Sequence, residues 1–429
     1  MPSYAILGLG LSGQSAVTYL LSRGEQNPTL YVSPNEADAV RRDYPSLAVK
    51  TSWEEIPEEV LVRSPGVRPD IPGIARALAR GARLTSEIEL FIEGCPAPIY
   101  GVTGSDGKTT TATLAARLLE AMGKHTWLGG NIGVSLLPFL SEMRPADAVV
   151  LELSSFQLMT FTPRLAAAAV TNLTENHLNW HTDMEEYARA KRNIFVGAAR
   201  RVENARAPIA PAYPHLTFSA TVENANYRMK DGQLLRGDEF LAHTSDLRVP
   251  GLYQRENLLC AAALTDAPAP AVAEVARTFT GVRYRCERVG ECHGVTCYDS
   301  SIDTTPARTA VTLRGLPAPL TVLAGGRNKN LNLTPLSDAL IAYAAQVVFF
   351  GECGEEMLAS LLSHPAYRGT PRAVLEPDFE RAVALALAST PQGGTLVLSP
   401  AAASFDAFSS YRARGDAYRA CLAAHGMTR

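Results

Sequence analysis

Short apolar runs alternate with longer amphipathic stretches along most of the chain. The first run, Tyr4 to Leu7, leads into the glycine-rich GLGLSG, then into a stretch that is amphipathic through Arg23, and a second apolar run follows at Leu30 to Val32. This strand, helix, strand order is typical of doubly wound α/β folds, whose sheets are mostly parallel. The opening of the chain therefore predicts a Rossmann-like unit.

A second block begins after GCPAPI, a proline-spaced segment with the composition of a linker. Its pattern predicts strands at Ile99 to Val102, Ala148 to Leu153 and Ala166 to Thr171, and helices at Thr109 to Met122 and Met184 to Ala199. From about Pro208 to Pro250 the pattern is looser. Within this segment MKDGQLL, with its Asp-Gly pair, predicts a β-hairpin.

A third block follows Phe279, where helical stretches separate strands predicted at 295–298, 320–324, 347–351 and 395–398. We therefore predict an α/β protein of three domains, each a mostly parallel sheet with helices. The expected ranges are 1–93 for a Rossmann-like domain, 94–283 for a central domain and 284–429 for a second Rossmann-like domain. The length of 429 residues agrees, since about 150 residues is a usual domain size.

Composition and charge narrow the classes of partner. Hydrophobic residues make up 46% of the chain, and 40 basic residues against 43 acidic ones leave a formal charge of -3. Such a balance is ordinary for a globular protein and does not favour nucleic acid or an anionic membrane surface. The longest apolar runs are shorter than the 18 or so residues needed to span a bilayer. We therefore expect small-molecule substrates, with no nucleic acid and no membrane.

The chain start and the cysteines indicate the compartment. MPSYAILGLG has neither the basic region nor the cleavage site of a secretory signal. Seven cysteines are present, and Cys286, Cys292 and Cys297 form the one close group, without the spacing of a zinc site. Reduced thiols in a cytoplasmic protein are the simplest interpretation.

The glycines of GLGLSG, namely Gly8, Gly10 and Gly13, match a motif that lets a phosphate approach a helix N-terminus. An NAD site would also need an acidic residue at the end of the second strand. Val32, Ser33 and Pro34 stand there instead. A nucleotide of another kind or a plain tight turn remains open.

The strongest local signal is GVTGSDGKTTT, which lies between a strand and a helix and resembles a P-loop. Backbone N–H groups from Gly104 to Gly107 would hold phosphates, Lys108 would reach the terminal ones, and the Thr109 hydroxyl would face Mg²⁺. The motif departs from the strict pattern, because Val102 stands where its first glycine belongs. The strand-to-helix context still favours phosphate binding.

Two further residues could complete a metal site. Glu152 lies at the end of a predicted strand, where an isolated carboxylate is often a surface residue, but the neighbouring strand leads into the P-loop. His177, in TNLTENHL, is by itself better explained as a helix cap or a core histidine than as a metal ligand. Together with Thr109 they offer oxygen ligands and one imidazole, a set that suits two magnesium ions around a triphosphate. Asn131 in GGNIG adds an amide, whereas Lys191 by itself is only a basic residue on an amphipathic helix.

The order TGSDGKTT, GGNIG, ELSSFQL, NHL and Y-x-x-A-K resembles the central ATPase domain of the Mur ligase family, whose members join amino acids to a UDP-muramoyl precursor of bacterial peptidoglycan. ELSSFQL and the distant LSPAAASFDAF are similar to the branch that adds D-glutamate, and the similarity extends over nearly the whole chain. The resemblance implies an ATP-dependent carbon-nitrogen ligase that adds D-glutamate to UDP-N-acetylmuramoyl-L-alanine through an acyl phosphate.

The resemblance also implies the site residues, which group by ligand. For the UDP precursor they are Leu11, Ser12, Ser64, Pro65, Gly66 and Asn131. For ATP they are Gly104, Ser105, Asp106, Gly107, Lys108, Thr109, Thr110, Asn257, Arg285 and Asp299. Lys329, Ser404 and Tyr411 would hold D-glutamate, and Thr109, Glu152, His177 and Lys191 would hold Mg²⁺. Lys191 would act as a carbamate formed with CO₂, and Lys108, His177 and Lys191 would be the catalytic residues.

The chain departs from the family pattern at Tyr253 and Gln254, where His-Asn is usual, at Ser301, where a lysine is common, and at Tyr411, where phenylalanine is common. A related Mur-type or folylpolyglutamate-type ligase with another amino acid is the main alternative. The DNPR motif typical of the diaminopimelate-adding member is absent. A nicotinamide-dependent dehydrogenase and a catalytically silent nucleotide-binding module are weaker alternatives. A monomer whose last domain closes over ATP is expected.

Overall fold

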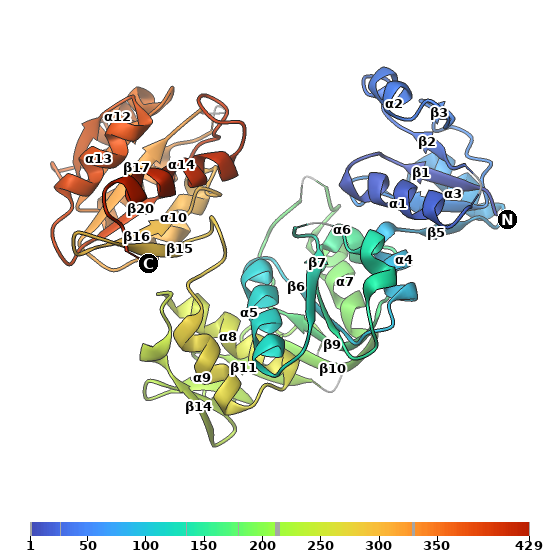
Figure 1. Ribbon diagram of the computed structural model, residues 1–429, viewed down its shortest axis with the longest axis horizontal. Coiled ribbons are helices and arrows are strands. Elements are labelled where there is room, and N and C mark those ends of the chain that lie inside the picture. Colours follow the sequence, from blue (N-terminus) through green and yellow to red (C-terminus); the bar gives the residue numbers. More distant parts are fainter. Residues whose placement is uncertain are drawn as a thin grey trace. The chain divides into compact units, whose positions relative to one another are not determined.

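The computed structural model describes residues 2–25, 27–133, 135–178, 180–210, 215–327 and 331–428. These residues form three sheets (Figure 1). The chain divides into two compact units, of which unit 1 comprises Met1–Thr244 and Glu256–Val275, and unit 2 comprises Ser245–Arg255 and Ala276–Arg429. Unit 1 holds the first two sheets and unit 2 holds the third.

The first sheet has five parallel strands in the order β3-β2-β1-β4-β5. Its elements are β1 (Tyr4–Leu7), α1 (Leu11–Ser22), β2 (Thr29–Tyr31), α2 (Ala37–Asp43), β3 (Val49–Lys50), β4 (Val60–Arg63), α3 (Pro72–Ala79), β5 (Arg83–Thr85) and α4 (Glu87–Gly94). The chain order reverses at β1, which has β2 on one side and β4 on the other. Ligands of open α/β sheets bind at such a switch point, at the carboxyl ends of the strands.

The second sheet has nine strands in the order β14-β13-β12-β11-β10-β9-β6-β8-β7. Its strands are β6 (Ile99–Thr103), β7 (Thr126–Gly130), β8 (Ala148–Glu152), β9 (Arg164–Val170), β10 (Gly197–Asn204), β11 (Leu216–Ser219), β12 (Tyr227–Lys230), β13 (Gln233–Arg236) and β14 (Glu239–His243). The pairs β12 with β13 and β13 with β14 are antiparallel, and the other pairs are parallel. Since β6 lies between β8 and β9, the segments that follow these three strands meet at one edge.

The helices of this part of the chain are α5 (Lys108–Ala121), α6 (Ser155–Leu158), α7 (Met184–Arg192), α8 (Leu252–Thr265) and α9 (Ala269–Thr278). Three short 3-10 helices, η1 (Leu137–Glu142), η2 (Asn193–Phe195) and η3 (Thr244–Asp246), complete it. The central strands are apolar and buried, with Val149, Leu151 and Ala168 at 0% exposure. Burial of this kind on both faces is the normal state of parallel strands covered by helices.

The third sheet has six strands in the order β15-β16-β20-β17-β18-β19, and only the pair β15 with β16 is antiparallel. Its elements are β15 (Glu287–Cys292), β16 (Val295–Asp299), α10 (Pro306–Arg314), β17 (Leu320–Gly325), α11 (Thr334–Tyr343), β18 (Gln346–Phe350), α12 (Gly354–Leu362), β19 (Arg372–Leu375), α13 (Phe379–Ser389), β20 (Thr395–Leu398) and α14 (Tyr411–Ala424). Val322 and Leu323 belong to different apolar clusters, because successive side chains face opposite sides of a strand. The sheet is therefore packed on both faces.

The predicted fold class is confirmed, and so is the hairpin. Strands β12 and β13 pair antiparallel around Asp231 and Gly232, whose φ values of 47° and 74° suit a tight hairpin turn. The helix expected from Met184 to Ala199 was predicted too long, since α7 ends at Arg192 and β10 begins at Gly197. Pairing of β10 with β9 overrides the local helical pattern there. The domain boundaries at 93 and 283 stay predictions.

None of the helices in the described part of the chain combines the length and the apolar character needed to cross a bilayer.

Gly13 offers a test of how the first strand meets the first helix. A Cβ at Gly13 would meet the carbonyl oxygen of Gly8, whereas a Cβ at Gly10 would meet nothing within 4 Å. We expect Gly13→Ala to lower the free energy of unfolding by about 1–3 kcal/mol, the usual cost of overpacking, and Gly10→Ala to change it little. Urea unfolding followed by circular dichroism measures both, and equal midpoints for the two variants would contradict this packing.

Candidate active site

The loop between β6 and α5 has the backbone of a phosphate-binding turn. Gly104 and Gly107 have φ values of 147° and 78°, which L side chains rarely adopt. A Cβ at Gly104 would also meet the side chain of Thr171, which follows β9 and donates a hydrogen bond of 2.5 Å to the carbonyl oxygen of Asp106. The segment after β9 therefore holds this loop in place.

Asn172 accepts hydrogen bonds from two backbone N–H groups of the loop. The N–H of Ser105 donates to the Asn172 carbonyl at 3.0 Å, and the N–H of Asp106 donates to its side-chain oxygen at 2.9 Å. The Ser105 hydroxyl is likewise engaged, 2.9 Å from the carbonyl oxygen of Thr174. The N–H groups of Ser105 and Asp106 are thus engaged within the protein, and phosphate binding by the N–H groups around Gly104 to Gly107 stays a prediction. The first turn of α5, whose N–H groups have no intrahelical acceptor, is the better anion site.

Two lysines converge on one carbonyl oxygen at this loop. Lys108 Nζ donates to Gly104 O at 2.9 Å, and Lys191 Nζ donates to the same oxygen at 2.7 Å. Lys191 is 1% exposed, and its Nζ lies 4.4 Å from the ring centroid of Tyr187. Burial, with the positive charge of Lys108 as a second cause, lowers the pKa of Lys191 to about 6. A substantial fraction of Lys191 is therefore a neutral amine near pH 7.

The Glu152 carboxylate brings together three of the expected site residues. Thr109 Oγ1 donates to Glu152 Oε2 at 2.7 Å, and Asn131 Nδ2 donates to Glu152 Oε1 at 2.9 Å. Glu152 ends β8 and is 2% exposed. The P-loop hydroxyl, the GGNIG amide and this carboxylate thus meet at the carboxyl edge of the sheet.

Asn257, expected at the ATP site, lies against the same loop. Thr111 Oγ1 is 3.3 Å from Asn257 Oδ1, and a Cβ at Gly107 would meet the Asn257 amide. Thr110, the next expected ATP residue, is buried in the first turn of α5. The structure therefore places α8 beside the loop that the phosphate motif predicted.

His177 lies in a tight turn after β9. Its φ of 57° is in the left-handed region, and its ring centroid is 5.1 Å from that of Phe156. Partial burial lowers the pKa of His177, and the charges of Lys108 and Lys191 lower it further. The neutral imidazole that results is the form that ligates metal ions.

A complete cage of metal ligands is not part of this arrangement. Within the described ranges no three His, Cys, Asp or Glu side chains gather as a metal site. Mg²⁺ usually takes one or two carboxylates and completes its shell with phosphates and water. The hydroxyl of Thr109 and the carboxylate of Glu152 fit that chemistry, and the place of His177 at the metal stays a prediction.

The glycine turn after β1 and the loop after β4 meet at the switch point of the first sheet. Ser64 Oγ donates to Gly8 O at 2.7 Å, which places the Ser64-Pro65-Gly66 loop beside the turn that contains Leu11 and Ser12. Leu11 is 79% exposed at the start of α1. Five of the six residues expected to hold the UDP precursor therefore lie near the ends of β1 and β4, whereas the sixth, Asn131, follows β7 of the second sheet.

In unit 2, Asp299 ends β16 with its carboxylate buried at 0% exposure. Its Oδ2 accepts from Arg419 Nη2 at 2.8 Å, and its Oδ1 accepts from the Ser301 N–H at 2.9 Å. Burial raises the pKa of Asp299. In this structure the carboxylate is engaged within its own unit, and its expected contact with the ATP ribose stays a prediction.

Two of the remaining expected residues of unit 2, Arg285 and Tyr411, lie on segments that Ser300 and Ser301 join. The N–H of Cys286, next to Arg285, donates to Ser300 Oγ at 3.0 Å, and Ser301 Oγ donates to the Tyr411 carbonyl at 2.8 Å. Ser404 is 2% exposed in the loop after β20. Lys329 lies outside the described residues.

Sequence reasoning missed several residues that organise these loops. Arg414 is 0% exposed and donates to carbonyl oxygens of Ser301, Ala402 and Ala403, which lie after β16 and β20. Arg63 is 1% exposed and donates to the carbonyl oxygens of Pro65, Val67 and Phe156. Of these two arginines, only Arg63 has a sequence feature that could have indicated a buried role, because it is a charged residue at the end of the apolar strand VLVR.

Lys191 gives a pH dependence that can be measured. Its folded-state pKa of about 6 lies below the ordinary value of 10.5, so the unfolded chain binds one more proton across that window. The free energy of unfolding therefore rises with pH between about 6 and 10.5, by at most ~1.4 kcal/mol per pH unit for this one group. In buffer free of CO₂, we expect Lys191→Met to remove this contribution.

Urea unfolding at several pH values measures the slope. Lys124→Met, which alters an exposed lysine in the turn after α5, is the matched control and should keep the wild-type slope. Parallel curves for wild type and Lys191→Met would show that Lys191 is not a deprotonated amine in the folded state.

A family model described as the Mur ligase middle domain matches residues 102–265. A relative from Clostridium novyi, named UDP-N-acetylmuramoylalanine--D-glutamate ligase, is 35% identical over an alignment of 436 positions, gaps included, that covers 97% of this chain and 95% of the relative. A relative of the same name from Acetivibrio thermocellus is 36% identical over 445 positions, again covering 97% of this chain and 95% of the relative.

The fold has solved counterparts. The structure of a UDP-N-acetylmuramoyl-L-alanyl-D-glutamate--2,6-diaminopimelate ligase matches with a TM-score of 0.59 at 16% identity, covering 100% of this chain and 96% of that one. A similarity this distant in sequence speaks for the fold alone, whereas the two relatives align over almost their whole length. On that similarity, this chain belongs to the Mur ligase family.

Proposed function

We propose that the protein is an ATP-dependent ligase that adds D-glutamate to UDP-N-acetylmuramoyl-L-alanine. The observation that supports it most is the Glu152 carboxylate, held between the P-loop hydroxyl of Thr109 and the amide of Asn131. This arrangement joins a phosphate-binding loop to an oxygen ligand for Mg²⁺ at one sheet edge. The printed name of the two relatives supplies the amino acid and the acceptor.

The reaction needs ATP because amide formation from a free carboxylate in water runs uphill. A carboxylate oxygen of the precursor attacks the γ-phosphorus, the bond to ADP breaks, and an acyl phosphate forms. The amine of D-glutamate then attacks the acyl carbon, loses a proton, and displaces inorganic phosphate. Positioning and electrostatics supply most of the rate in phosphoryl transfer.

The residues around the P-loop suit that task. The N–H groups at the start of α5 and the ammonium of Lys108 would neutralise phosphate charge. Thr109, Glu152, His177 and a carbamylated Lys191 would hold the magnesium ions. Bound Mg²⁺ would supply charge neutralisation on the phosphate oxygens.

Carbamylation of Lys191 is part of the proposal. A neutral amine is the form that adds to CO₂, and the new N–C bond with loss of a proton leaves a carbamate anion. Lys191 is buried, its pKa is about 6, and it shares the Gly104 carbonyl with the cationic Lys108. Conversion to an anion would place a negative charge beside the ammonium of Lys108, which would attract it.

The other sites follow from the family resemblance. We assign the UDP precursor to Leu11, Ser12, Ser64, Pro65, Gly66 and Asn131, and D-glutamate to Lys329, Ser404 and Tyr411. ATP would be bound by residues 104–110 together with Asn257, Arg285 and Asp299. We further propose that the enzyme acts as a cytoplasmic monomer on small molecules, in keeping with seven cysteines that are all free thiols here.

The substrate assignment is tested by phosphate release from ATP in the presence of UDP-N-acetylmuramoyl-L-alanine. We expect release with D-glutamate and none above background with L-glutamate, L-lysine, meso-diaminopimelate or D-alanyl-D-alanine. Release with another of these amino acids would keep the ATP chemistry and favour a related ligase. Silence with all of them would contradict the proposed activity.

Lys108→Ala should lower kcat by at least ~100-fold, because a charge that neutralises the transferring phosphoryl group is lost. Lys124→Ala, which alters an exposed lysine just beyond the other end of α5, is the control and should keep wild-type turnover. Near-normal turnover of Lys108→Ala would remove the P-loop assignment.

The carbamate is tested by carbon-13 NMR in labelled bicarbonate. Wild type should show a carbamate resonance that Lys191→Ala lacks, and added acetate should restore part of the turnover lost in that variant. A spectrum of Lys191→Ala identical to that of wild type would place any carbamate elsewhere.

A further inference from the structure

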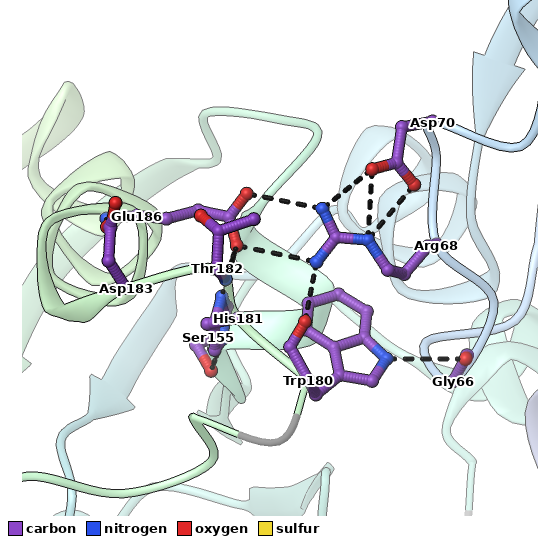
Figure 2. A network of polar contacts seen from close by, with 9 residues as sticks. All are labelled: Gly66, Arg68, Asp70, Ser155, Trp180, His181, Thr182, Asp183 and Glu186. Carbon is purple, nitrogen blue, oxygen red and sulfur yellow. Dashed lines mark hydrogen bonds and ion pairs between the residues drawn. The ribbon is translucent and has the colours of Figure 1, made fainter.

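One arginine connects the loop after the Ser64-Pro65-Gly66 motif to the segment between β9 and α7 (Figure 2). Arg68 Nη1 donates to the Trp180 carbonyl oxygen at 2.5 Å, and Nη2 pairs with Glu186 Oε1 at 3.3 Å. The same guanidinium pairs with Asp70, its Nη2 lying 2.8 Å from Oδ2, and lies over the Trp180 ring at 5.1 Å. Arg68 therefore joins Asp70, in the loop after β4 of the first sheet, to Trp180 and Glu186, which follow β9 of the second sheet.

The side chain of Trp180 also contacts the Ser64-Pro65-Gly66 loop. Its indole N–H is 3.5 Å from the carbonyl oxygen of Gly66, as Figure 2 shows, and its ring lies 4.3 Å from that of Phe156. The backbone of the same residue binds the turn of His177. The N–H groups of Trp180 and His181 both donate to the His177 carbonyl at 3.0 Å.

Glu186 extends the network toward the end of β8. Its Oε2 lies 3.2 Å from His181 Nδ1 and accepts from the Thr182 N–H at 2.9 Å. His181 is 2% exposed, and its Nε2 lies 2.9 Å from Ser155 Oγ, three residues beyond Glu152. Glu186, a partner of Arg68, thus contacts the segment after His177 directly. It is also linked, through His181, to the segment after Glu152.

We propose that Arg68 is a positioning residue that couples the precursor-binding loop to the turn carrying His177. The roles of that loop and of His177 rest on the proposed function. Lysine should replace Arg68 only in part, because a single ammonium cannot serve a carbonyl and two carboxylates in the planar arrangement of a guanidinium. The ion pairs alone would contribute little at 25% side-chain exposure. The bond to the Trp180 carbonyl is the specific element.

A second arginine, Arg63, connects the end of β4 in the first sheet to the segment after β8 in the second sheet, independently of Arg68. Arg63 Nη2 donates to the Phe156 carbonyl at 2.7 Å and lies 3.3 Å from Thr160 Oγ1, and this side chain is buried. Arg68 variants should therefore fold, with a changed turn and an intact contact between the sheets.

The first experiment needs no substrate. Hydrogen exchange of the free protein, read by mass spectrometry over residues 173–190, should be at least ~10-fold faster in Arg68→Ala, since an amide protected by a local contact exchanges on its opening. Arg68→Lys should restore only part of the protection. Arg41→Ala, which removes an exposed arginine paired with Asp38 on α2, is the matched control and should exchange as wild type. Equal exchange in Arg68→Ala and Arg41→Ala would overturn the proposal.

The second experiment follows turnover with D-glutamate and the UDP precursor. We expect Arg68→Ala to lower kcat by ~10-fold to 100-fold, the cost of a small misplacement of a reacting group, and to raise the Mg²⁺ concentration for half-maximal rate several-fold. If the kcat of Arg68→Ala and its Mg²⁺ concentration for half-maximal rate both lie within twofold of the values for Arg41→Ala, the proposed coupling is overturned. If wild type itself is inactive while the exchange result holds, the proposed function fails and the positioning of the His177 turn stands.

Discussion

Two lysine side chains share the carbonyl oxygen of Gly104, and much of the site is arranged around this concentration of positive charge. Lys108 and Lys191 both donate to that oxygen, one from the P-loop and one from α7. Their charges lower the pKa of His177 and, through Lys108, that of Lys191. A cluster of cationic groups is costly once it is removed from water, and a bound anion such as a polyphosphate would offset that cost. The same groups would attract such an anion to the loop.

Parallel sheets bring the groups together because they align strand ends. In the second sheet β6, β8 and β9 are neighbours, so the P-loop, Glu152 and the Thr171 segment share one edge. In the first sheet β1 and β4 are neighbours, and Ser64 contacts the carbonyl of Gly8. In the third sheet β16 and β17 flank β20, so that the loops after these three strands are adjacent. Each sheet thus presents loops from a switch point, where open α/β sheets bind ligands.

Buried or half-buried arginine side chains stabilise the loops at the strand ends by donating hydrogen bonds to them. Arg63 and Arg414 are almost completely buried, and burial lowers the pKa of each to about 10. Taking a guanidinium out of water is tolerable where its fork of donors meets several acceptors. The carbonyl oxygens of turns provide such acceptors, and the loop is ordered in return. Arg68 uses the same chemistry between two sheets, with Trp180 and Glu186 as its partners.

The sequence by itself determined the fold class, most strands, the hairpin at Asp231 and Gly232, and the place of the P-loop, because these depend on local periodicity and turn chemistry. Its motifs also identified Thr109, Glu152 and Asn131, whose meeting at one edge follows from parallel strands. Tertiary structure alone decided that α7 stops at Arg192, since β10 pairs with β9. It also brought distant partners to Arg63, Arg68, His181 and Arg414, such as Phe156 to Arg63 and Trp180 to Arg68. An arginine has the same local pattern in solvent or in a network, and only the acceptors that folding brings to it make the difference.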